Sequence, residues 1–201
     1  MVLPHLKTIA GKFLAQKLNV SNSISTYHLA ERFRCDELIS DAKNFIFENF
    51  ATVAAREDFL NLSSEQVKMW ISSDEINVGA EEDVFKIILT WIDHGNKERK
   101  EHFSELFREV RLCYISRDFL RSDIVTNDLV NDNDGCVDRV KEAMKLIDSK
   151  DYHHLSVKPR KSLESPVIVA CMAGFRARDD HILCCYQDGR ASCRERVYVL
   201  V

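Results

Sequence analysis

The alternation of apolar and polar positions is densest in residues 81–94, EEDVFKIILTWIDH. Three acidic residues open this stretch, as the positive end of a helix favours. Only Lys86, Thr90 and Asp93 interrupt the apolar run that follows, and their spacing places them on one narrow stripe. The pattern predicts a central helix buried on nearly all sides, ending at Gly95 in a left-handed residue. The residues expected to form its core are Val84, Phe85, Ile88, Trp91 and Ile92.

Apolar residues recur at helical spacing through most of the chain before residue 148. No proline occurs from residue 5 to residue 158, which suits helices because an interior proline costs about 3 kcal/mol. Further helices are predicted over residues 3–18, 24–33, 36–50, 63–71, 97–107 and 136–147. Helix follows helix with brief links, so the predicted fold class is all-α, an array of antiparallel helical hairpins.

Polar residues at the ends of these segments predict where several helices begin. Ser63 and Gln66 fit a capping box. Asp36 is expected to cap the helix over residues 36–50, and Ser116 and Thr126 to cap two short helices further on.

The character of the chain changes after Asp151. Residues 158–161, KPRK, followed closely by serines, are interpreted as a solvated tether. The runs at 166–171 and 181–186 are rich in strand-forming residues, and we predict an incomplete β-hairpin there. Residues 189–197, GRASCRERV, resemble the translation of a sequencing-adapter oligonucleotide, so the tail is expected to be non-native; an ordinary charged loop is the alternative.

Composition narrows the class of protein. A net charge of −4 over 201 residues gives no basic footprint for nucleic acid or for an anionic membrane. Seven cysteines without regular spacing indicate reduced thiols. We therefore expect a cytoplasmic protein, with the nucleus as a further possibility if the basic run at 158–161 acts as an import signal.

Two clusters resemble metal sites but fit them poorly. Residues 130–135 alternate acidic side chains before a glycine, yet the twelfth position of a calcium loop falls on Lys141, where glutamate is required. His181, Cys184, Cys185 and Cys193 could offer zinc ligands, but no pair of Cys-x-x-Cys motifs exists and buried cysteines are the better interpretation. No phosphate loop, nucleophile elbow or metalloprotease motif occurs. We predict no catalytic residues, no cofactor and no metal.

Residues 3 to about 148 resemble the segment that joins the BTB and Kelch domains of Kelch-like proteins, the two-helix 3-box and the helical BACK domain. The resemblance is most specific over residues 72–78, SSDEINV. It continues through Glu82, Val84, Phe85, Trp91, Ile92, Arg99, residues 110–112, Phe119, Leu120, Cys136 and Ala143. Residues matching the 3-box and the start of BACK are Phe13, Leu14, Asn22, Ala30, Cys35, Leu38, Ala42 and Phe50. Residues 166–186 are similar to the first two strands of a Kelch blade, although residues 172–174, MAG, replace the usual double glycine.

This resemblance implies a domain plan. Residues 1–21 correspond to the end of BTB and the first 3-box helix, and residues 22–148 to BACK, with the 3-box continuing to about residue 50. Residues 149–165 correspond to a linker, 166–188 to a partial first Kelch blade, and 189–201 to the tail. The chain is thus expected to begin after nearly all of BTB and to stop inside the first blade.

The resemblance implies a substrate-adaptor segment of a cullin-3 RING ubiquitin ligase, promoting ubiquitination and degradation. Its candidates for the apolar wall of the cullin groove are Leu6, Phe13, Tyr27 and Phe33, some of which must instead close the chain's own core. Cullin-3 binding is expected to be weak without BTB, homodimers to form only in the full-length protein, and an unknown substrate to bind the missing propeller. The alternatives are a scaffold that organises actin or intermediate filaments, and a plain helical repeat scaffold.

Overall fold

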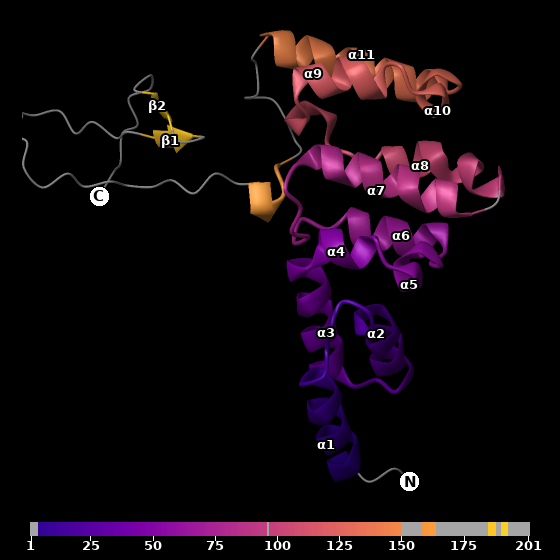
Figure 1. The fold of residues 1–201 in the computed structure, drawn as a ribbon, viewed down its shortest axis with the longest axis vertical. Helices are drawn as coiled ribbons and strands as arrows, with labels where there is room; N and C mark the ends of the chain where they lie inside the picture. Colours follow the sequence, from indigo (N-terminus) through magenta and orange to yellow (C-terminus); the bar gives the residue numbers. More distant parts are fainter. Residues whose placement is uncertain (1–3, 96, 150–157, 164–184, 188–189, 193–201) are drawn as a thin grey trace, which may run out of the picture. The chain divides into compact units, whose positions relative to one another are not determined.

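The computed structural model describes residues 4–95, 97–149, 158–163, 185–187 and 190–192. The chain divides into two units, Met1–Leu163 and Glu164–Val201. The described part of the first unit is helical (Figure 1), which confirms the predicted all-α class. Its longer helices are α1 (Pro4–Ala15), α2 (Ser23–Arg32), α3 (Asp36–Glu48), α6 (Ser64–Ile71), α7 (Glu81–His94) and α11 (Asp134–Ser149). Its shorter ones are α4 (Phe50–Ala54), α5 (Glu57–Leu60), η1 (Lys97–His102), α8 (Phe103–Phe107), η2 (Leu112–Tyr114), α9 (Arg117–Phe119), η3 (Leu120–Ile124), α10 (Asp128–Asn131) and η4 (Lys161–Leu163).

Within the first unit, helices pack mainly on their neighbours in the chain (Figure 1). Both α1 and α2 contact α3, and α4 and α5 contact α7. Next to α7 lies α8, which also contacts α6 and α11. Helix α7 therefore joins the earlier helices to the later ones.

Helix α7 has the bounds that the sequence predicts, Glu81–His94. Its buried apolar residues include Val84, Phe85, Ile88, Trp91 and Ile92. Lys86, Thr90 and Asp93 are exposed, as expected for a helix open to water along one stripe. The indole Nε1 of Trp91 donates a hydrogen bond to the carbonyl of Leu62 at 3.0 Å, so the polar atom of this buried ring is satisfied.

Aromatic rings connect α7 to later segments. The ring of Phe85 meets Phe103, Phe107 and Phe119 edge to face, with centroids 6.5, 5.9 and 6.1 Å away. Edge-to-face pairs each add about 0.5–1.5 kcal/mol beyond the apolar area they bury. Phe85 therefore joins α7 to α8 and α9 in one core.

The end of α7 differs from the prediction at Gly95. Its φ of −104° and ψ of −171° are extended, not left-handed. The glycine is required by a close approach instead, because a Cβ there would lie 2.1 Å from Cδ of Arg99. The Arg99 guanidinium lies 4.3 Å from the centroid of the Trp91 ring and donates to the carbonyls of Trp91 and Leu60 at 2.7 and 2.8 Å.

The structure tests the predicted helix starts. The capping box of Ser63 and Gln66 is confirmed, with both reciprocal hydrogen bonds present. The prediction for Thr126 is wrong: the cap of α10 is Asn127, whose side chain accepts from the amide of Leu129 at 3.0 Å. Asp36 is the first residue of α3, one position later than a cap. Short polar side chains compete closely for these positions, so spacing alone does not choose among them.

Residues Lys158–Leu163 are not a solvated tether. Arg160 is fully buried, and its guanidinium pairs with the equally buried carboxylate of Glu81 at 2.8 Å. This pairing corrects the interpretation of the basic run, since one of its charges is removed from water altogether. Charges of this kind occur in protein interiors when they are paired and hydrogen-bonded. We call Lys158–Leu163 the clasp.

In the second unit, the described residues are β1 (Cys185–Gln187) and β2 (Arg190–Ser192), an antiparallel pair in which Tyr186 faces Ala191. The predicted strand at 166–171 and most of the one at 181–186 lie outside the described residues. Strand β2 falls instead in the tail that the sequence suggests is non-native, and that origin stays a prediction.

We predict that Trp91→Ala lowers the free energy of unfolding by about 3–5 kcal/mol, because it empties a large site in the core. Trp91→Phe keeps a ring but leaves the Leu62 carbonyl unpaired, so the expected loss is about 1–2 kcal/mol. Urea unfolding followed by circular dichroism measures both. A loss below about 1 kcal/mol for Trp91→Ala would contradict a central role for α7.

A second stability prediction concerns the ion pair of the clasp. Arg160→Met should cost about 3–5 kcal/mol, because it leaves the Glu81 carboxylate buried without a countercharge. Lys161→Met is the matched control, since Lys161 pairs with Glu75 in water and its loss should cost no more than about 1 kcal/mol. The same urea titration compares them, and equal losses would show that burial of the pair has no energetic consequence.

Candidate functional site

The first helix presents an apolar face to water. Leu6, Ile9 and Phe13 are 59%, 64% and 59% exposed. Their spacing of three and four residues places them on one side of α1. Large apolar residues clustered on one face of a helix are typical of an interaction surface rather than of chance exposure. We call these three residues the α1 face.

Helix α1 is held in this orientation through its opposite side. Gly11 is the buried residue there, and a Cβ on it would lie 3.0 Å from Sγ of Cys35 and 3.9 Å from Cβ of Leu38. The absence of a side chain at Gly11 thus lets α1 lie close to α3. The ammonium group of Lys7 donates to the carbonyl of Arg34, which ties α1 to the turn between α2 and α3.

That turn carries a second exposed apolar group. Phe33 ends α2 and is 60% exposed. Arg34, next along the chain, has a φ of 51°, in the left-handed region where glycine is usual. The amide of Cys35 donates to the carbonyl of Ala30 at 2.9 Å and closes the helix end. The turn is therefore a defined helix stop.

Tyr27 does not share the exposure of the other three groove candidates. It is 7% exposed, and its ring meets Trp70 edge to face with centroids 5.0 Å apart. Its hydroxyl donates to the carboxylate of Glu31 at 2.7 Å. Burial, the hydrogen bond and the negative charge of Glu31 raise the pKa of Tyr27 to about 12. Tyr27 is thus a core residue, and Leu6, Phe13 and Phe33 are the candidates that lie at the surface.

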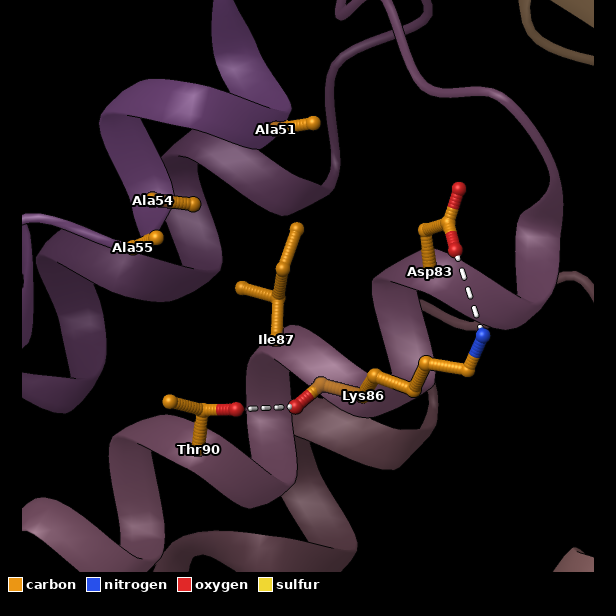
Figure 2. A pocket seen from close by; sticks show the side chains of 7 residues that line it. All are labelled: Ala51, Ala54, Ala55, Asp83, Lys86, Ile87 and Thr90. Carbon is orange, nitrogen blue, oxygen red and sulfur yellow. Dashed lines mark hydrogen bonds and ion pairs between the residues drawn. The ribbon is translucent and has the colours of Figure 1, made fainter.

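Figure 2 shows a shallow hollow between α4 and α7. Ile87 points into it, with three alanines on one side and the polar stripe of α7 on the other. Lys86 pairs with Asp83 at 3.4 Å, and the Thr90 hydroxyl donates to the Lys86 carbonyl. The volume of the hollow, about 200 Å³, is below the roughly 300–1,000 Å³ of small-molecule sites. The hollow is not a convincing ligand site.

A larger cleft, of about 450 Å³, lies between α11 and the residues that follow α8. Two of its three arginines are engaged. Arg139 donates to the carbonyls of Phe107, Arg108 and Val110 at 2.6, 3.0 and 3.3 Å, and Arg111 pairs with Asp74 and donates to the carbonyl of Lys158. Burial raises the pKa of the Cys113 thiol in the same cleft, which keeps the thiol protonated and weakly nucleophilic. The Cys113 thiol is therefore not an activated nucleophile, and the guanidinium groups of Arg139 and Arg111 already donate within the protein.

In the part of the chain that the structure describes, no three histidine, cysteine or acidic side chains are arranged so that they could hold a metal ion. In the acidic segment at 130–135, the Asn133 side chain accepts from the amide of Cys136 at 3.1 Å, near the start of α11. His181, Cys184 and Cys193 lie outside the described residues. In the described part of the chain, no helix is long and apolar enough to cross a membrane.

The most distinctive surface of the described helical unit is thus the exposed apolar face of α1. The family model described as "BTB And C-terminal Kelch", BACK, matches residues 23–125, just over half of the chain. The chain belongs to this family.

Several curated proteins are similar to the chain. Human (Homo sapiens) Kelch repeat and BTB domain-containing protein 12 is 26% identical over 182 residues, 89% of this chain and 29% of that protein. Mouse (Mus musculus) Kelch-like protein 17 is 36% identical over 135 residues, 67% of this chain and 21% of that protein. Kelch-like protein 2 of Rattus norvegicus is 32% identical over 163 residues, covering 81% and 26%. The chain spans about a quarter of the length of these relatives.

Two features of the unit were missed from the sequence. Ile9 is the most exposed of the large apolar residues on α1, yet periodicity gave it no special place among its apolar neighbours. Arg160, predicted with its flanking lysines to be solvated, is buried against Glu81, which the sequence marks only as an acidic residue at a helix start. The one sequence feature that sets Arg160 apart is the preceding Pro159. A proline restricts the backbone but does not indicate which residue the next side chain pairs with.

Burial of Tyr27 predicts a pH dependence. Tyrosine in the unfolded chain titrates near pH 10, so between about pH 10 and 12 the unfolded state loses a proton that the folded state keeps. Stability should therefore fall as pH rises through this window. A shift of about two pKa units corresponds to roughly 2.7 kcal/mol, which water around the exposed Glu31 reduces to about 1–2 kcal/mol.

The control for this prediction is Tyr27→Phe, which removes the titrating group. Urea unfolding at pH 9 to 12 should show the wild-type chain losing this extra stability relative to the variant. Parallel curves for the two proteins would contradict the assignment of Tyr27 to the core.

Proposed function

We propose that the chain is the BACK-containing segment of a substrate adaptor for a cullin-3 RING ubiquitin ligase. Membership in the "BTB And C-terminal Kelch" family supports the class of adaptor. The observation that carries the proposal is the α1 face, because an apolar helix side that does not close its own core can bind a partner. In this proposal the chain is a binding module in the cytoplasm and not an enzyme. Other parts of the ligase transfer ubiquitin.

The size of the surface sets the expected affinity. Stable specific complexes bury about 1,200–2,000 Å² in total. The three exposed apolar side chains of α1, together with Phe33 just after α2, supply only part of such an area. In the proposal, a BTB domain supplies the remaining contact and the dimer interface. The chain alone should therefore bind weakly.

We predict that the chain binds the cullin-3 N-terminal domain no tighter than tens of micromolar, about −6 kcal/mol. Joining a homologous BTB domain ahead of Met1 should tighten binding at least about a hundredfold, or about 2.7 kcal/mol. Isothermal titration calorimetry measures both affinities. Submicromolar binding by the chain alone would overturn this account of the interface. If the protein does not bind cullin-3 but sediments with actin or intermediate filaments, the cytoskeletal alternative is favoured.

Residue variants in the BTB-joined protein locate the contact. Phe13→Ser should weaken cullin-3 binding about tenfold or more, because it removes a large apolar group from the α1 face. Met69→Ser is the matched control, since Met69 is an exposed apolar residue on α6. An equal effect of both variants, or none for Phe13→Ser, would exclude the α1 face as the contact.

A further inference from the structure

The clasp is held by every hydrogen-bond donor of one guanidinium. Nε and Nη2 of Arg160 donate to the two carboxylate oxygens of Glu81 at 2.8 and 3.0 Å. Nη1 donates to the carbonyls of Ile71 and Ser73, each at 2.7 Å, and Nη2 also reaches the carbonyl of Glu109 at 3.3 Å. These five contacts match the five N–H groups that a guanidinium possesses.

The acceptors come from three places in the fold. Ile71 ends α6 and Ser73 follows it, Glu81 begins α7, and Glu109 follows α8. Carbonyls at the ends of helices lack partners within the helix, so Arg160 supplies donors that these ends need. An ammonium group has three donors on a single atom and cannot reproduce this fork. The site therefore requires arginine.

Weaker contacts extend along both sides of Arg160. The Lys161 amide donates to the carbonyl of Asp74 at 3.0 Å, and the Val78 amide donates to Oγ of Ser162 at 3.2 Å. On the other side, the Arg111 guanidinium donates to the carbonyl of Lys158 at 2.9 Å. The clasp thus runs against the link between α6 and α7, and its last residue, Leu163, is also the last residue of the first unit.

We propose that Arg160 is the residue that anchors the clasp and so fixes where the chain leaves the helical unit. The buried guanidinium anchors the clasp, and the contacts on either side then set its path. The inference is independent of cullin binding. It concerns how any domain that follows Leu163 is attached to this unit.

Amide hydrogen exchange of the full chain tests the proposal, with Glu81→Met/Arg160→Met as the principal variant. Replacing a buried ion pair by apolar residues of similar volume preserves a core. We expect the amides of α7 to exchange within about threefold of the wild-type rates, and those of Lys161 and Val78 to exchange at least about thirtyfold faster. Lys161→Met is the control, because it removes an exposed pair with Glu75 and leaves Arg160 in place, so both groups of amides should be unchanged.

Arg160→Lys is a second variant, which keeps a positive charge beside Glu81. It is used if the amides of α7 lose their protection against exchange in the double variant. In Arg160→Lys, exchange at Lys161 and Val78 should increase about tenfold relative to exchange in α7. Retained protection of Lys161 and Val78 in these variants would overturn the proposal, because it would show that packing alone holds the clasp.

Discussion

A carboxylate without access to water must have partners, and the partner of Glu81 lies 79 residues further along the chain. Its oxygens accept from Arg160 and from the amide of Arg111 at 3.0 Å, so the start of α7 is bonded to two distant segments. An ion pair of this kind adds little net stability over an apolar pair, but losing one member leaves a buried charge. The first unit therefore depends on the chain reaching as far as Arg160, well beyond the last long helix.

Features encoded over short distances could be predicted from the sequence. Helix α7 was found with its bounds because acidic residues, apolar density and Gly95 all occur within fifteen positions. The capping box at Ser63 was found for the same reason. The role of Gly95 could not be predicted, because its requirement comes from the guanidinium of Arg99 and not from its own backbone angles. Arg160 could not be predicted either, since a basic run beside a proline has the composition of a solvated segment.

The candidate site shows a different limit of sequence patterns. Periodicity identified the apolar side of α1 but not what covers it, because a core face and an interaction face have the same spacing. Tyr27 and Phe13 were grouped as candidates, although Tyr27 packs on Trp70 inside the unit while Phe13 faces water. The tertiary packing separates the two roles, since the Trp70 ring of α6 covers Tyr27 while Phe13 stays exposed.

Gly11 gives the α1 face an indirect dependence on a residue that a partner never touches. The gap of 3.0 Å between its missing Cβ and the sulfur of Cys35 determines how closely α1 lies on α3. A methyl group at this position would require either the Cys35 side chain or α1 to give by a few tenths of an ångström, and a shift of α1 would move Leu6, Ile9 and Phe13 as one body. In the proposed cullin contact, such a shift would weaken binding while every exposed side chain remained unchanged, and an alanine scan confined to the surface would not find the cause.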